Sequence, residues 1–76
     1  MENNWQNLIS IDPDIRFGKP VITGTRICVS DILSWLSTGM SFEEIIEDFP
    51  ELKREHILAS LAFAANRENI TKIIAA

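Results

Sequence analysis

The chain has 76 residues, a formal net charge of −4 and 46% hydrophobic residues, a balance typical of one small folded domain. Its single cysteine, Cys28, excludes an internal disulfide, and no paired cysteine and histidine spacing indicates a zinc site. We therefore expect no bound metal and no cofactor. The negative net charge also disfavours a general nucleic-acid binder, because such binding depends on the neutralisation of phosphates.

The apolar runs are too short for a membrane span, which needs roughly 18 consecutive apolar residues. The first residues also lack the basic and apolar regions of a secretory leader. We expect a cytoplasmic protein without membrane contact, stabilised by forming a homodimer because so short a chain buries only a small core.

Residues 9–29 predict a β-hairpin region. Residues 9–11 alternate like an edge strand, and a strand is expected to begin again at residues 21–22. Gly24 can supply a turn residue with positive φ, after which the β-branched residues 27–29 are expected to return as the partner strand.

A first helix is predicted over residues 30–38. Ser30 is a suitable N-cap, and Gly39 is a suitable residue just beyond the C-terminus. The apolar residues recur at helical spacing and indicate the face toward the core: Val29, Ile32, Leu33 and Leu36.

A second helix is predicted over residues 41–49. Ser41 and Glu44 form a capping box at its start, and Pro50 ends it because the residue before a proline avoids helical angles. Its apolar positions again recur at helical spacing: Phe42, Ile45, Ile46 and Phe49.

A third helix is predicted over residues 53–67, which makes a helix-turn-helix pair with the second. Projection at 100° per residue assigns two opposite faces to it. The inward face comprises Ile57, Leu61, Ala64 and Ala65, with Leu58 at its edge, and the outward face comprises His56, Ser60, Phe63 and Arg67.

Residues 68–76 form a C-terminal extension with two possible structures. If the third helix continues through them, Ile70 and Ile74 extend the outward series into a seam that another helix could pack against. If the helix breaks at residues 66–69, the isoleucines fold back as a small fourth helix. The pattern leaves both alternatives open.

The basic residues near the predicted hairpin also have two interpretations. Arg16, Lys19 and Arg26 are candidates for contacts with a DNA backbone, in the manner of a wing. Alternatively, Arg26 forms a structural ion pair with one of three carboxylates, which is the interpretation that we favour for this residue. The three carboxylates are Asp12, Asp14 and Asp31.

The sequence contains few residues that could form an active site. Its one histidine, His56, lies on a predicted helix turn, and Cys28 has no base that the sequence places nearby. Gly18 and Gly24 lack the Gly-Lys-Ser/Thr ending of a phosphate-binding loop. We expect no catalytic residues.

A specific motif remains, Gly18-Lys19-Pro20 followed by Gly24-Thr25-Arg26. Together with Ile11-Asp12-Pro13, the Ser41 capping box and the alanine-rich third helix, it resembles the prokaryotic family known as domain of unknown function 433. The resemblance covers residues 9–67. It implies a homeodomain-like or winged trihelical fold, usually discussed as an antitoxin that binds operator DNA and a toxin resembling a PIN-domain ribonuclease.

We therefore expect a mainly α, trihelical helix-turn-helix domain with a short N-terminal β-hairpin. Its expected function is that of a DNA-binding regulator, the antitoxin of a toxin–antitoxin pair. The alternative is a dimeric protein-interaction module that does not bind DNA. The candidate DNA contacts are Arg16, Lys19, Arg26, Lys53, Arg54, His56, Ser60 and Arg67, and the candidate dimer or partner contacts are Phe63, Ile70 and Ile74.

Overall fold

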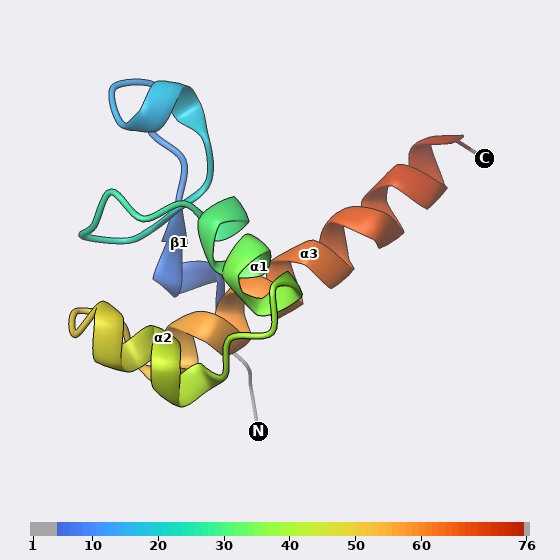
Figure 1. The fold of residues 1–76 in the computed structure, drawn as a ribbon. Helices are drawn as coiled ribbons and strands as arrows, with labels where there is room; N and C mark the ends of the chain where they lie inside the picture. Colours follow the sequence, from blue (N-terminus) through green and yellow to red (C-terminus); the bar gives the residue numbers. More distant parts are fainter. Residues whose placement is uncertain (1–4, 76) are drawn as a thin grey trace.

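Three helices and one short antiparallel strand pair make up the fold, as expected for a mainly α domain (Figure 1). The computed structural model describes the backbone of residues 5–75 and the side chains of residues 5–66. In chain order, the elements are the 3-10 turn η1 (Trp5–Leu8), β1 (Ile9–Ser10), the 3-10 turn η2 (Arg16–Gly18), β2 (Val21–Ile22), α1 (Val29–Ser37), α2 (Phe42–Asp48) and α3 (Arg54–Ala75).

The strand pairing differs from the predicted hairpin. β2 pairs with β1, with Ile9 opposite Ile22, whereas residues 27–29 contribute only an isolated bridge between Val21 and Cys28. The expected turn does form, with Gly24 at a φ of 85°. The chain does return beside β2, since Ile22 N–H donates to the Ile27 carbonyl at 2.9 Å and Val29 N–H donates to the Pro20 carbonyl at 3.0 Å. A full third strand does not form, because helix α1 already begins at Val29.

Helix α1 begins two residues earlier than an N-cap at Ser30 would place it. The N-cap is Cys28, whose backbone N–H donates to Asp31 Oδ2 at 3.0 Å. A carboxylate three residues after the N-cap accepts from the N-cap amide and also interacts favourably with the helix dipole. Asp31 therefore stabilises a start at Cys28, and Ser30, which we expected as the N-cap, lies in the first turn of the helix. Gly39 follows the helix with a φ of 100°, as predicted.

The capping box of helix α2 is confirmed. Ser41 N–H donates to Glu44 Oε1 at 2.8 Å, and Glu44 N–H donates to Ser41 Oγ at 3.1 Å. The helix ends at Asp48, before Phe49 and Pro50. The ring of Phe49 stacks on Trp35 of α1 at a centroid distance of 4.3 Å, which joins the end of α2 to α1.

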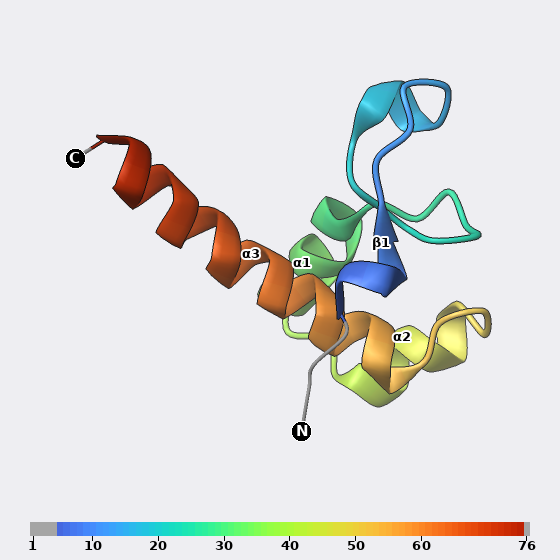
Figure 2. The ribbon, with the colours of Figure 1, turned by 180° about the vertical axis from the view of Figure 1, so that it is seen from behind.

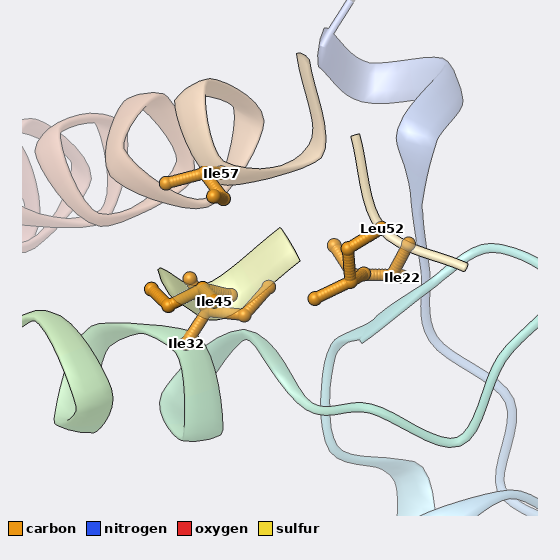
Figure 3. Close-up of a cluster of buried hydrophobic side chains, with 5 residues drawn as sticks. All are labelled: Ile22, Ile32, Ile45, Leu52 and Ile57. Atoms are coloured by element: carbon orange, nitrogen blue, oxygen red, sulfur yellow. The ribbon is translucent and has the colours of Figure 1, made fainter. Parts of the chain in front are cut away.

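The core lies where β2, the three helices and the α2–α3 turn converge (Figure 3). Its five largest aliphatic side chains come from five different segments, so no single element supplies the core. They are Ile22, Ile32, Ile45, Leu52 and Ile57, all of them buried. The predicted apolar stripes of α1 and α2 thus point inward, as does Ile57 of α3.

The predicted faces of α3 require a correction. Ser60, expected to face outward, is fully buried together with Ala59, whereas Leu58 and Leu61 are 47% and 40% exposed. Helix α3 packs against η1, α1 and α2. Small side chains allow such elements to approach closely, and Ser60 satisfies its hydroxyl within the helix by donating to the carbonyl of His56 at 3.0 Å.

The backbone of α3 continues without a break through residues 66–69 to Ala75, which decides between the two structures considered for the C-terminal extension. Both views show its C-terminal turns projecting away from the rest of the chain (Figures 1 and 2). No helix in the described part of the chain has the length and apolar content needed to cross a membrane.

Candidate contact surfaces

The exposed side of α3 is apolar near the body of the domain. Leu58, Leu61 and Ala65 are exposed at spacings of three and four residues, so they lie along one side of the helix. We call these three residues the outer face of α3. They offer no hydrogen-bonding group to a base edge or a phosphate, but they can bury area against another protein.

The start of α3 carries the exposed cations Lys53 and Arg54. The Arg54 guanidinium lies 4.8 Å from the centre of the Phe42 ring, an arrangement that holds the end of the side chain near α2. The imidazole of His56 is turned back toward the chain, because its Nδ1 accepts a hydrogen bond from Lys53 N–H at 2.8 Å. His56 was predicted to point away from the helix and contact DNA. Its imidazole instead caps the start of α3.

Helix α2 and the turn after it form an acidic surface. Five carboxylates are exposed between residues 43 and 51, and Glu55 adds another in the first turn of α3. These charges lie close in sequence to Lys53 and Arg54 and oppose the approach of a phosphate backbone to the start of α3.

The basic residues of the 16–26 segment divide into two kinds. Arg16 is held within the fold: its Nη1 donates to the Arg26 carbonyl at 2.8 Å and lies 3.6 Å from Asp31 Oδ2. The side chains of Lys19 and Arg26 are exposed. Asp31 therefore forms an ion pair with Arg16, and the predicted ion pair of Arg26 is wrong.

A cavity of about 310 Å³ opens beside this segment, between the start of α1 and the middle of α3. Lys19 and Pro20 line it on one side, and Leu33 and Phe63 line it on the others. The ring of Phe63 also meets Trp5 edge-on at a centroid distance of 6.0 Å. Phe63 is thus partly buried inside its own chain, which corrects its predicted place on an outward seam.

The remaining predicted contacts are only partly accounted for. Ser60 was predicted to contact DNA, but its side chain is buried and cannot do so. The side chains of Arg67, Ile70 and Ile74 lie outside the described residues. Among the side chains that the structure describes, no group of three or more His, Cys, Asp or Glu residues is arranged to hold a metal ion.

Sequence reasoning missed one residue altogether, Phe17, whose side chain is 96% exposed. A signal for it was present, because an aromatic residue between Arg16 and Gly18 belongs to no apolar stripe. The outer face of α3 was missed for another reason: Leu58 and Leu61 are the residues that a helical projection assigns to the core.

The comparisons with known proteins agree on a family of unknown function. Residues 9–64 match the model for "Protein of unknown function (DUF433)". The uncharacterized protein y4eO of Sinorhizobium fredii is 39% identical over 62 residues, which are 80% of this chain but only 28% of that protein. A crystal structure of a DUF433 member from Anabaena variabilis has a TM-score of 0.75 at 30% identity, covering 93% of this chain and 71% of the other.

Proposed function

We propose a function for this chain, which belongs to the DUF433 family, as a non-enzymatic protein-interaction module. In this proposal it acts in the cytoplasm as the antitoxin-type partner of a second protein. The observation that carries the proposal is the apolar outer face of α3, which lies between the exposed polar residues of the first turn and Asn66. A helix that reads DNA presents polar and basic side chains to the groove, whereas the outer face of α3 consists of Leu58, Leu61 and Ala65.

The negative charge of the chain also favours a protein partner over DNA. The net charge is −4, and the exposed carboxylates of α2 precede Lys53 and Arg54 along the chain. A protein partner with an apolar patch rimmed by basic residues complements these features, because an interface has an apolar centre and a charged rim. The expected partner is the PIN-like ribonuclease that the family resemblance implies.

The test is a titration of the purified chain with the product of the adjacent gene, followed by calorimetry. Leu58→Glu is expected to weaken binding by about 100-fold, because it places a charge at the centre of an apolar contact. Ile11→Glu introduces the same charge at an exposed apolar residue outside α2 and α3, so it is the matched control and should bind like the wild type. Equal affinities of Leu58→Glu and wild type for that protein would refute the proposed surface.

DNA binding is the second candidate, favoured by four exposed cations: Lys19, Arg26, Lys53 and Arg54. It is tested by the salt dependence of binding to the DNA upstream of the gene. If these residues contact phosphates, the double variant Lys53→Ala/Arg54→Ala lowers the slope of log K against log [salt] by about 2. An unchanged slope would remove both residues from a DNA interface.

A further inference from the structure

The loop that contains η2 has an unusual backbone. Three consecutive residues, Arg16, Phe17 and Gly18, have positive φ values of 51°, 60° and 80°. Glycine adopts this region freely, but for an L residue it costs about 1–2 kcal/mol. Hydrogen bonds hold the loop in place, from Gly18 N–H to the Ile15 carbonyl and from Lys19 N–H to the Arg16 carbonyl, each at 3.1 Å.

This backbone presents Phe17 to solvent. Its side chain is 96% exposed, and the loop extends away from the helices in both views (Figures 1 and 2). The fold gains little from an aromatic ring in such a position. Strained backbone is concentrated at functional sites, so the strain beneath this exposed ring favours Phe17 as a contact residue.

The cavity beside the loop has the properties needed to receive a ring. Its volume is about 310 Å³, and a dry apolar cavity of roughly 150 Å³ already holds benzene. Leu33, Phe63 and Ala64 supply an apolar lining, and Lys19 adds a cation. Phe17 does not fill the cavity of its own chain, because the ring is almost wholly exposed.

We propose that Phe17 of one copy inserts into this cavity of a second copy, and that a two-fold axis makes the insertion reciprocal. Each chain carries both the ring, at Phe17, and the cavity, whose lining includes Lys19, so one surface patch can pair with its own copy across a two-fold axis. The charges also match: Asp14 is exposed on the loop that carries the ring, and Lys19 is exposed at the cavity.

The expected dimer is weak. Two aromatic rings bury about 300–500 Å², whereas stable interfaces begin at roughly 1,200 Å². Self-association should therefore be weak and should depend on protein concentration up to the millimolar range. The outer face of α3 has no part in this contact, so failure of the dimer would leave the proposed protein-binding function intact.

The first experiment compares the sedimentation of three proteins over a range of concentrations. Phe17→Gly should weaken the dimer by about tenfold or more, because it removes the ring without disturbing the core. Leu61→Ser, on the outer face of α3, is the control and should dimerise like the wild type. The proposal is overturned if the wild type stays monomeric at millimolar concentration, or if Phe17→Gly associates as strongly as the wild type.

A charge exchange identifies the occupant as a second copy. Asp14→Lys and Lys19→Asp should each weaken the dimer by about threefold to tenfold, and the double variant should restore it, because the exchanged charges meet again across the two-fold axis. Such a rescue requires both partners to carry both changes. A double variant that associates no better than either single variant would contradict the reciprocal contact.

Discussion

The helical body and the loop at residues 11–20 are built on different principles. In the body, buried Ile22, Ile32, Ile45 and Ile57 meet from separate segments, and their burial stabilises the fold. In the loop, Phe17 is exposed and its backbone is strained. The contrast indicates that the body stabilises the fold and that the loop contacts a second copy of the chain. Substitution of a core residue should therefore lower the free energy of unfolding, whereas substitution of Phe17 should raise it.

The largest expected effect belongs to the body. Ile45→Ala should lower the free energy of unfolding by about 2–4 kcal/mol, because it leaves a cavity among side chains from several segments. Ile11→Ala is the matched control, since Ile11 is exposed, and should change stability by less than about 0.5 kcal/mol. Urea denaturation of both variants measures the difference, and similar losses would show that the core is not centred on Ile45.

A smaller loss is expected at the start of α2. Ser41→Ala removes the hydroxyl that accepts from Glu44 N–H, at a cost of about 1 kcal/mol. Ser34→Ala, at an exposed position within α1, should be neutral or slightly stabilising because alanine favours a helix. Thermal unfolding of the two variants in parallel distinguishes the cap from a general effect of removing a serine.

The smallest effect has the opposite sign and lies in the loop. Phe17→Gly should raise the free energy of unfolding by about 0.5 kcal/mol, because glycine relieves the positive φ at some cost in chain entropy. The measurement belongs at low protein concentration, where self-association does not contribute. A clear loss of stability would mean that the ring supports the fold, and the contrast between the two regions would fail.

The sequence predicted the parts of the fold that local chemistry determines. The capping box of Ser41 and Glu44, the positive φ of Gly24 and Gly39 and the inward stripes of α1 and α2 all depend on neighbouring residues. The boundaries of α1 and α2 lie within one residue of the prediction for the same reason, whereas α3 ends at Ala75, beyond the predicted residue 67. The mainly α fold class is confirmed.

The errors arose where distant segments meet. The orientation of α3 depends on its packing against η1, α1 and α2, in which the small residues Ala59 and Ser60 are buried. A helical projection assigns the largest apolar side chains to the core, so it cannot predict that a helix buries small residues instead. The conformation of Arg16 depends partly on a hydrogen bond to the Arg26 carbonyl, ten residues away. Neither interaction has a local signature, so the predicted outward face and the ion pair of Arg26 were both wrong.

The orientation of α3 is tested most directly by thiol labelling. The native Cys28 is buried and should react slowly, so it provides a low background. A cysteine introduced by Leu58→Cys should be modified rapidly under native conditions, whereas one introduced by Ser60→Cys should be protected about as well as Cys28. Rapid labelling of Ser60→Cys together with protection of Leu58→Cys would reverse the two faces of α3 and contradict the proposed protein-binding surface.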